Sequence, residues 1–378
     1  MIIAIDASRA NRPHKTGTEW YAYNIIQGLK KADSSNRYFL YTDRPLEGQL
    51  AELPPNFCAY RLRWPFGRGW NYARLGLALA QAKPEIFWQP AHNFPFVGGQ
   101  SNIITWHDLA YEYYPELYSD AQLRSLRQGV RQLRTRADKI ITVSDHSKND
   151  IVTRYQIPAS KIEVIHLGIN NYLFRPYSTA DIEAFKKRRN IEQPYFVSIG
   201  RLEDKKNITN LILAFNEYKN KGGEGQLRLL GSPGFGYETI RRTIDDSSYK
   251  QEIIEEGYIP QSELPLFMAA ATALIHPSYY EGFGLTVVEA QAVGCPVLCS
   301  VSGSLPEVTG GQALFFQAND YEEIAANMDT VSAQPDESLI HRGIENARRF
   351  TWEAAVKKTL AVFEQALKKE RQRGSEEE

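Results

Sequence analysis

Short apolar segments rich in β-branched and aromatic residues recur along the whole chain, and amphipathic stretches separate them. In the first part of the chain they read IIAID, YFLYT, EIFWQ, NIITW and KIITVS, and in the second part YFVSIG, LRLLG, TALIHP and PVLCS. The intervening stretch 18–31 has a helical period, because its apolar residues recur near one face. These residues are Trp20, Ile25, Ile26 and Leu29. Strands that alternate with such helices form parallel sheets, so the sequence predicts a doubly wound α/β architecture.

The chain is long enough for two domains that each bury a core, since it has 378 residues, 43% of them hydrophobic. The alternation of strands and helices is interrupted at 170–193, where polar and turn residues dominate, so we expect an interdomain linker there. The predicted domains span 1–170 and 190–350, with a cleft between them. A last amphipathic helix is predicted within 351–370. Its apolar residues are Ala355, Leu360, Val362, Phe363 and Leu367.

Net charge and cysteine content argue against several classes of protein. The formal net charge is −1 with 24% charged residues, so bulk electrostatics favour neither a nucleic-acid partner nor a polyanionic substrate. The three cysteines form a sparse, odd set that suits a reducing cytosol better than a disulfide framework. The N-terminus enters a short strand without a basic leader, and no apolar run reaches the roughly 18 residues of a membrane-spanning helix. We therefore expect a soluble, cytoplasmic protein.

The stretch HPSYYEGFGLTVVEAQAVGCPV carries the strongest chemical signal. A predicted strand ends at its first two residues, and a loop with Gly282, Phe283 and Gly284 leads to a helix that begins near Leu285. Helix N-termini leave backbone N–H groups unpaired and carry a partial positive charge, and glycines let a diphosphate approach the backbone closely. The stretch therefore predicts a binding site for a diphosphate.

Two glutamates flank this turn. Glu281 precedes the helix, where its carboxylate can face a sugar, and Glu289 lies about one turn into the helix, where it can accept both ribose hydroxyls. Their setting in strand, turn and helix resembles the E-x7-E element of retaining glycosyltransferases of the two-domain GT-B type, in particular glycosyltransferase family 4 (glycosyl transferases group 1). In that family the first glutamate binds sugar hydroxyls and the second binds ribose. Position 286 is Thr where the family usually has Pro.

The segment GRLEDKKN, directly after the strand YFVSI, resembles the family's G-R-L-x-x-x-K-N element. The resemblance implies that Arg201 and Lys206 bind the donor diphosphate, with Lys205 as an adjacent candidate. Two fixed cations there stabilise the negative charge that a departing nucleoside diphosphate gains in the transition state. The alternative is a pair of solvated surface cations.

Further segments resemble elements of the family's first domain. KTGTEWYAYNI is similar to the glycine loop that opens the first long helix, with Thr16 in place of the usual first glycine, so Gly17 alone provides close approach to the diphosphate. ITWHDLAYEYYPE matches the family's His-Asp-Leu turn, which implies that His107 lies beside the donor sugar and Asp108 on the acceptor side. TVSDHSK resembles the Val-Ser-x-x-Ser turn, which implies that Ser144 ends a strand on the acceptor side. The final FTWEAAVKKTLAVF resembles the family's terminal helix, which crosses back onto the first domain.

Sequence motifs for metals and redox cofactors are missing. No Asp-x-Asp occurs, and the cysteines and histidines lack zinc spacing. The glycines of GSPGFG, which follows LRLLG, are in the wrong order for a dinucleotide-binding fingerprint. We therefore expect no cofactor and no required metal, so that the helix N-terminus, Arg201 and Lys206 meet the charge of the diphosphate.

Residues 122–139 form a predicted basic helix in which arginines recur at spacings of three and four beside an apolar stripe. The arginines are Arg124, Arg127, Arg131 and Arg134, and the stripe consists of Leu123, Leu126, Val130 and Leu133. One interpretation is a core-facing stripe with a solvated basic face. The other is peripheral contact with anionic lipid at the inner face of the cell membrane. Family enzymes often use lipid-linked acceptors, which favours the second interpretation without deciding between the two.

The resemblance covers nearly the whole chain and implies a GT-B fold, two Rossmann-like doubly wound domains that face each other across a cleft. It also implies retaining transfer of a hexose from a nucleotide sugar to a carbohydrate or lipid-linked acceptor in bacterial polysaccharide or glycolipid synthesis. The opening MIIAIDAS with the later HDL turn looks most like mannosyltransferases, so GDP-mannose is the first donor hypothesis. Two alternatives stay open: a catalytically silent nucleotide-sugar sensor or scaffold, and a sugar-nucleotide epimerase on the same fold.

Overall fold

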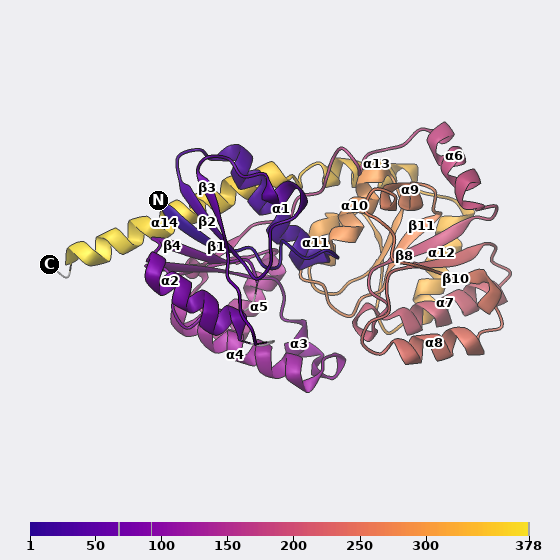
Figure 1. Cartoon of the computed structure of the whole chain (residues 1–378). Coiled ribbons are helices and arrows are strands. Elements are labelled where there is room, and N and C mark those ends of the chain that lie inside the picture. Colours follow the sequence, from indigo (N-terminus) through magenta and orange to yellow (C-terminus); the bar gives the residue numbers. More distant parts are fainter. Residues whose placement is uncertain (67–68, 92, 377–378) are drawn as a thin grey trace. The chain divides into compact units, whose positions relative to one another are not determined.

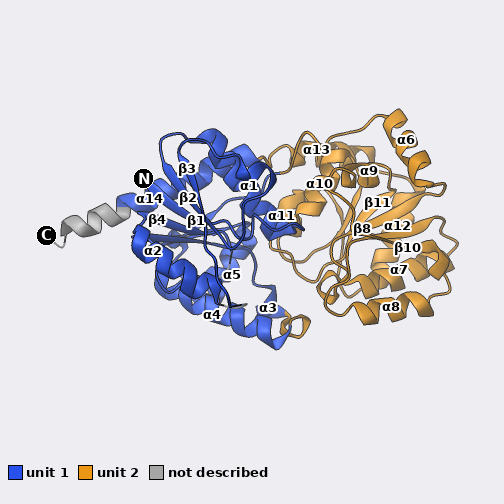
Figure 2. Ribbon diagram, in the orientation of Figure 1, with its two compact units in different colours: residues 1–113, 119–168, 352–378 blue, residues 114–118, 169–351 orange. Residues whose placement is uncertain are grey.

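The chain forms two compact units in the computed structural model, which describes residues 1–66, 69–91 and 93–376 (Figure 1). Unit 1 comprises residues 1–113 and 119–168 together with the last helix, which begins at Trp352 (Figure 2). Unit 2 comprises residues 114–118 and 169–351. The two units are described separately below.

The described part of unit 1 contains a parallel sheet of seven strands in the order β3-β2-β1-β4-β5-β6-β7. The strands are β1 (Ile2–Asp6), β2 (Arg37–Thr42), β3 (Phe57–Arg61), β4 (Ile86–Gln89), β5 (Ser101–Trp106), β6 (Lys139–Thr142) and β7 (Ile162–Val164). The helices are α1 (Gly17–Ala32), α2 (Gly76–Ala82), α3 (Ala110–Tyr113), α4 (Asp120–Arg136), α5 (Asp145–Tyr155) and α14 (Trp352–Glu376). A π-helical stretch, Trp70–Leu75, leads directly into α2.

The last helix, α14, packs against the first helix of unit 1, although more than 300 residues of sequence separate them (Figure 1). Gly28 allows the two backbones to approach closely, because a Cβ at that position would lie 2.2 Å from Val356 Cγ2. Phe363 is fully buried and its ring lies 5.8 Å from that of Trp88 on β4. Burial of a large apolar side chain of this kind contributes about 1.5 to 3 kcal/mol, so α14 is part of the core of unit 1.

The described part of unit 2 contains a parallel sheet of six strands in the order β10-β9-β8-β11-β12-β13. The strands are β8 (Tyr195–Ile199), β9 (Gln226–Leu230), β10 (Ile253–Gly257), β11 (Ala273–His276), β12 (Val297–Ser300) and β13 (Leu314–Phe316). The helices are α6 (Thr179–Arg189), α7 (Ile208–Asn220), α8 (Tyr237–Asp246), α9 (Leu264–Ala269), α10 (Leu285–Val293), α11 (Leu305–Thr309), α12 (Tyr321–Ala333) and α13 (Glu337–Ala347).

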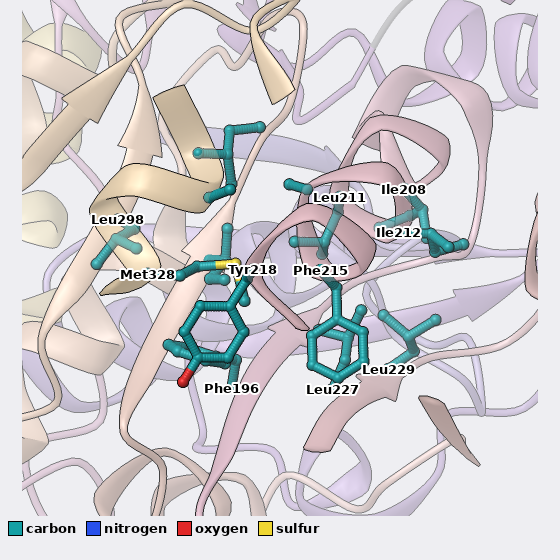
Figure 3. Packing of buried hydrophobic residues seen from close by; sticks show 14 of the residues in the cluster. Phe196, Ile208, Leu211, Ile212, Phe215, Tyr218, Leu227, Leu229, Leu298 and Met328 are labelled. Atoms are coloured by element: carbon teal, nitrogen blue, oxygen red, sulfur yellow. The ribbon is translucent and has the colours of Figure 1, made fainter. Parts of the chain in front are cut away.

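The hydrophobic core of unit 2 lies between the sheet and the apolar face of α7 (Figure 3). Leu211, Ile212 and Phe215 of α7 are fully buried and pack with Phe196 of β8 and Leu227 of β9. Their spacing of one, three and four residues is the period of a helix that buries one face. The core holds β8 in the middle of the sheet, and the loop after β8 starts from this rigid support.

The strand order of each sheet reverses at one point. In unit 2 the chain runs outward from β8 through β9 to β10 on one side, and from β11 through β12 to β13 on the other. In unit 1 the corresponding reversal lies between β1 and β4. In open α/β sheets, ligands bind beyond the carboxyl ends of the strands at such a switch point. The loops after β8 and β11 are therefore the expected ligand site of unit 2.

Every segment that the sequence predicted to be a strand is a strand, and the predicted doubly wound α/β class is confirmed. The unpredicted strands are β3, β7, β10 and β13, which are the two edge strands of each sheet. The predicted linker at 170–193 contains the helix α6, in which Phe185 alone is buried. The predicted basic helix ends at Arg136, because Lys139 already belongs to β6.

Candidate functional site

Two loops meet at the switch point of unit 2, one after β8 and one after β11. Asn207 joins them, because its side-chain amide donates to the carbonyl oxygen of Pro277, after β11, at 3.1 Å. The same amide donates to the carbonyl oxygen of Ala318, after β13, at 2.6 Å. The backbone N–H of Tyr279 donates to the carbonyl of Lys205 at 3.1 Å. These bonds fix the separation of the two loops, so the charged residues that they carry are held in a defined arrangement.

A pocket at the carboxyl ends of β8 and β11 is lined by residues of both loops, among them Gly200, Arg201, Lys206 and His276. Glycines make the tight packing beneath it possible. A Cβ at Gly231 would lie 1.7 Å from the carbonyl oxygen of Gly200, a distance that no side chain tolerates. The pocket is thus built on close backbone contact between the ends of β8 and β9.

The predicted residues Lys206 and Glu281 lie in direct contact. Lys206 Nζ is 2.5 Å from Glu281 Oε1, and both side chains are largely buried. The same carboxylate oxygen lies 2.9 Å from Nε2 of His276, the last residue of β11. Two donors therefore converge on one oxygen of Glu281.

The surroundings of Glu281 keep it ionised. Burial alone would raise its pKa, but the Lys206 ammonium and the hydrogen bond from His276 outweigh burial and hold the pKa well below its usual range. For His276, burial is the largest influence and lowers the pKa, against the opposing effect of Glu281. At neutral pH the site contains a carboxylate, an ammonium and a neutral imidazole.

The backbone of Glu281 is fixed as firmly as its side chain. Its carbonyl oxygen accepts hydrogen bonds from the N–H of Ser304 at 3.0 Å and from the hydroxyl of Ser304 at 3.1 Å. Gly303 has φ +61°, and a Cβ there would lie 2.3 Å from the same carbonyl. The stretch SGSLPEV after β12 therefore supports the position of Glu281.

The turn between Glu281 and α10 brings the N-terminus of that helix to the same place. Gly284 has φ +83° and directly precedes Leu285, the first residue of α10. This positive φ favours glycine, and a Cβ would also lie 2.5 Å from Leu305 Cδ2. Phe283 is buried against the ring of Phe350, at 5.5 Å and nearly perpendicular. The N-terminus of α10, with its partial positive charge, begins four residues after Glu281.

Glu289 lies in the second turn of α10 and is 7% exposed. Burial raises the pKa of its carboxyl to about 8. Among the described residues, none donates a hydrogen bond to it. Glu281 and Glu289 are thus two buried carboxyls of opposite character, one ionised and paired, the other protonated at neutral pH and available to polar groups of a ligand.

Arg201 lies on the loop after β8, as the predicted motif requires, but its side chain is more open than that of Lys206. It is 56% exposed, its Nε lies 3.9 Å from Glu203, and its Nη2 lies 3.5 Å from the carbonyl of Pro233. An exposed ion pair of this kind contributes little to stability. A ligand can therefore bind the Arg201 guanidinium with only a small loss of stability from the broken ion pair with Glu203.

In unit 1, Gly17 is the first residue of α1, and nothing lies within 4 Å of where its Cβ would be. Thr16, which stands where the related loop has glycine, forms the N-cap of the helix. Its backbone N–H donates to Glu19 at 3.2 Å, and its hydroxyl contacts the same carboxylate. Arg9 pairs with the other oxygen of Glu19 at 3.0 Å. The N-terminus of α1 is therefore held by these contacts of Thr16 and Glu19, and the Cα of Gly17 faces open space.

His107 follows β5 and is buried. Its Nε2 lies 2.9 Å from the carbonyl oxygen of Pro90, and its ring meets that of Tyr21 edge to face at 5.0 Å. Burial lowers its pKa, against smaller opposing effects of Pro90 and Asp108. His107 is therefore neutral at physiological pH, with Nε2 as the nitrogen that donates to Pro90.

The other two residues assigned to the acceptor side support turns. The side chain of Asp108 accepts from the N–H of Ala110 at 3.1 Å, at the start of α3. Ser144 is fully buried and caps α5, its hydroxyl accepting from the N–H of Ser147 at 3.1 Å. The hydroxyl of Ser147 in turn lies 3.3 Å from the carbonyl of His107. Ser144 is thus linked to the backbone of His107 through one side chain.

Sequence reasoning missed two further polar features. His276 stands in the quoted motif but was not assigned a role, although its position five residues before Glu281 was a usable signal. At the switch point of unit 1, the buried carboxylate of Asp6 accepts hydrogen bonds from Asn71 at 2.7 Å and from Gln89 at 3.1 Å. These residues are far apart in sequence and share no motif, so only the fold could bring them together.

The helix α4 has four exposed arginines, Arg124, Arg127, Arg131 and Arg134, called here the basic face of α4. Its apolar stripe is buried only at Leu133, while Leu123, Leu126 and Val130 are half-buried. The core-facing interpretation of the stripe therefore holds at one end of the helix. No helix in the described part of the chain is both long and apolar enough to cross a membrane.

Two family models match the chain and together account for most of it. The model described as "Glycosyltransferase Family 4" matches residues 15–171, and "Glycosyl transferases group 1" matches residues 180–350. The chain is 31% identical over 313 residues to the O-antigen chain mannosyltransferase B of Escherichia coli, covering 81% of this chain and 79% of that protein. It is 27% identical over 239 residues to the MMP alpha-(1->4)-mannosyltransferase of Mycolicibacterium hassiacum, covering 61% and 54%.

Solved structures share the fold over nearly the whole chain. Sucrose-phosphate synthase from Thermosynechococcus elongatus has a TM-score of 0.76 at 22% identity and covers 96% of this chain and 98% of that one. The Anabaena protein HepE, solved in complex with UDP and glucose, has a TM-score of 0.75 at 18% identity and covers 96% and 99%. At these identities the likeness concerns the fold alone.

Proposed function

The chain belongs to glycosyltransferase family 4 and has the GT-B fold, and on this premise we propose that it transfers a hexose from a nucleoside diphosphate sugar to an acceptor hydroxyl with retention of configuration. The observation that carries the proposal is the contact of Lys206 with Glu281 directly before α10, eight residues ahead of the buried Glu289. A cation and a helix N-terminus can bind the diphosphate of a sugar nucleotide, and two carboxyls can bind the hydroxyls of its ribose and its hexose.

The donor occupies the site as follows in this proposal. The diphosphate binds the N-terminal N–H groups of α10 together with Lys206 and Arg201, and Gly17 of unit 1 approaches it through its backbone. Glu289 accepts hydrogen bonds from the ribose hydroxyls. Glu281 accepts from hydroxyls of the hexose. His107 acts beside the transferred sugar.

The reaction needs no protein nucleophile. The bond between the anomeric carbon and the β-phosphate oxygen breaks, the acceptor oxygen bonds to that carbon from the same face, and the acceptor proton passes to the leaving phosphate oxygen. The negative charge that grows on the diphosphate is stabilised by Lys206, Arg201 and the dipole of α10, which are fixed before the reaction starts. Because these groups suffice for the charge, we propose that transfer requires no metal.

Mannose from GDP-mannose is the proposed donor sugar, and a carbohydrate or lipid-linked acceptor of bacterial polysaccharide or glycolipid synthesis is the proposed acceptor. The mannosyltransferase names of two relatives support this choice. The UDP in the HepE complex supports a uridine nucleotide as the competing donor. For a lipid-linked acceptor, we propose that the basic face of α4 contacts anionic lipid, each arginine contributing about 1 kcal/mol.

One experiment tests the proposal against both alternatives. Thermal stabilisation by GDP, UDP and ADP identifies the base, because a nucleotide at about one hundred times its dissociation constant adds roughly 2.7 kcal/mol. Release of nucleoside diphosphate from the matching nucleotide sugar is then measured. A silent sensor binds the donor without releasing nucleotide, and an epimerase changes the sugar while the nucleotide stays attached. Slow release of nucleotide is the result expected here.

A further inference from the structure

His276 is the last residue of β11 and contacts the carboxylate of Glu281. It is 2% exposed, and its Nε2 lies 2.9 Å from Glu281 Oε1 and 3.3 Å from the hydroxyl of Ser278. None of the steps proposed above uses it. A buried polar ring at this position has to have a partner, and the distances identify Glu281 as the main one.

The chemistry of the pair fixes the proton on the ring. An ionised carboxylate only accepts hydrogen bonds, so Nε2 must carry the proton that lies between His276 and Glu281. Burial favours the neutral ring, which leaves Nδ1 without a proton. A neutral donor is suited to this site, because a charged ring would add a third positive charge to those of Lys206 and Lys205, both of which already lower the pKa of the ring.

The two donors on Oε1 leave the second oxygen of Glu281 for other partners. Within the part of the chain that the structure describes, no hydrogen bond reaches Oε2. Lys206 alone would fix the carboxylate poorly, since an ammonium on a flexible stem is nearly a point charge. When a diphosphate binds, its negative charge also attracts the Lys206 ammonium. His276 is anchored at the end of a central strand, so its ring cannot move toward the diphosphate with the Lys206 ammonium.

We propose that His276 positions Glu281 for the donor sugar: its Nε2–H holds Oε1, so that Oε2 faces the hexose hydroxyls while Lys206 engages the diphosphate. His276 is a positioning residue, since it acts through Glu281 and touches no reacting atom. This inference rests on the proposed function and adds a residue that determines how the sugar is held.

Two substitutions separate the hydrogen bond from the bulk of the ring. His276→Leu is of similar size and has no donor, whereas His276→Gln keeps an N–H that can reach Glu281. For His276→Leu, kcat with the intact nucleotide sugar is expected to fall about 10- to 150-fold, the range for loss of a hydrogen bond to a charged group. The dissociation constant of the free nucleoside diphosphate is expected to stay within about twofold, because the nucleotide does not touch Glu281. His276→Gln is expected to restore most of the kcat.

A pH profile adds a readout that a purely structural role would not move. Loss of the His276 donor raises the pKa of Glu281 from its depressed value, although Lys206 and Lys205 still lower it. The acid limb of kcat is therefore expected to move to higher pH in His276→Leu and to return in His276→Gln. An acid limb at the same pH in all three proteins overturns the proposal.

Cys299 provides a matched control. It pairs with His276 in the register of β11 and β12 and is fully buried. Cys299→Ala is expected to lower thermal stability through a small cavity while kcat stays normal. The proposal is wrong if His276→Leu weakens nucleotide binding and kcat by the same factor, or if His276→Gln is as slow as His276→Leu.

The inference can also be tested apart from turnover. If the wild-type protein releases nucleotide from no sugar donor, the proposed function fails, and ¹⁵N NMR of the His276 ring still reports the contact. A neutral ring protonated on Nε2 is expected at neutral pH, with a shift of the Nε2 signal in Glu281→Gln. A proton on Nδ1, or no response to Glu281→Gln, overturns the role of His276.

Discussion

Replacing Glu289 with Gln is expected to stabilise the unliganded protein, and increasingly so at higher pH. Burial raises the pKa of Glu289 from its ordinary 4.5 to about 8. Between these values the unfolded chain releases the proton while the folded chain retains it, so stability falls as pH rises from 4.5 to 8 and is then level. Gln has nearly the same shape and never ionises, so it removes this loss.

The size of the effect follows from the two pKa values, at about 1.36 kcal/mol for each unit. The expected gain in the free energy of unfolding is about 1 kcal/mol at pH 5, about 3 kcal/mol at pH 7 and about 5 kcal/mol at pH 9. Glu281→Gln is the matched control with the opposite sign. Its pKa is depressed, so the ionised side chain stabilises the fold above its unfolded pKa, and the substitution is expected to destabilise at pH 7. That deficit disappears as pH falls through the depressed pKa.

The assay has to report unit 2. All six tryptophans lie in unit 1, so intrinsic fluorescence follows the wrong part of the chain. Amide hydrogen exchange in urea, read by mass spectrometry on peptides from β11, α10 and β12, gives the local free energy of unfolding at each pH. A gain that is equal at pH 5, 7 and 9, or a variant that is less stable at pH 9, would refute the reasoning.

Four further outcomes are expected. Glu289→Gln raises the dissociation constants of the nucleoside diphosphate and of the intact donor by the same factor. Glu281→Gln lowers turnover and leaves the affinity for the free nucleoside diphosphate almost unchanged. If calorimetry finds that both variants weaken binding of the free nucleotide equally, the assignment of Glu281 to the sugar is contradicted. Lys206→Ala lowers kcat about 100- to 1000-fold, and near-normal turnover contradicts its role in charge stabilisation. Turnover persists in excess EDTA. Complete loss of turnover in EDTA, followed by recovery when manganese or magnesium is added, contradicts metal independence. Replacing all four arginines of the basic face of α4 with Gln weakens co-sedimentation of the protein with anionic vesicles, while hydrolysis of soluble donor continues. Unchanged vesicle binding would show that these arginines form a solvated face with no role in lipid contact.

The sequence predicted the interior of both sheets and missed their edges. Interior strands are buried on both faces and therefore read as continuous apolar runs. Edge strands have one open side, and here they contain charged residues, such as Arg61 in β3 and Glu163 in β7, or span only three residues, as in β13. The helix α6 was missed because it buries a single side chain and has no apolar period, although its capping pair Ser178 and Asp181 was present in the sequence.

The motifs indicated which residues to propose for the donor site, but not how those residues interact with one another. Lys206 and Glu281 were predicted separately, and their contact depends on how the loops after β8 and β11 are joined by Asn207. The opposite protonation of Glu281 and Glu289 could not be predicted either, since it depends on neighbouring charge and burial, and the two residues are chemically identical in sequence. Ser144 and Asp108 were singled out from their turns, and the structure adds that Ser144 caps α5 and that the Asp108 carboxylate accepts a hydrogen bond from the N–H of Ala110.

The most direct test of the central claim is the stereochemistry of donor turnover. Incubation with GDP-mannose, or with the nucleotide sugar that the stabilisation screen selects, is followed in real time by ¹H NMR of the anomeric proton. Because GDP-mannose carries mannose in the α configuration, the account predicts that GDP is released and that α-mannose appears before mutarotation, with Lys206→Ala strongly slowed. Initial appearance of the β anomer would contradict retention, and a donor that binds but stays intact would contradict the assignment of a transferase.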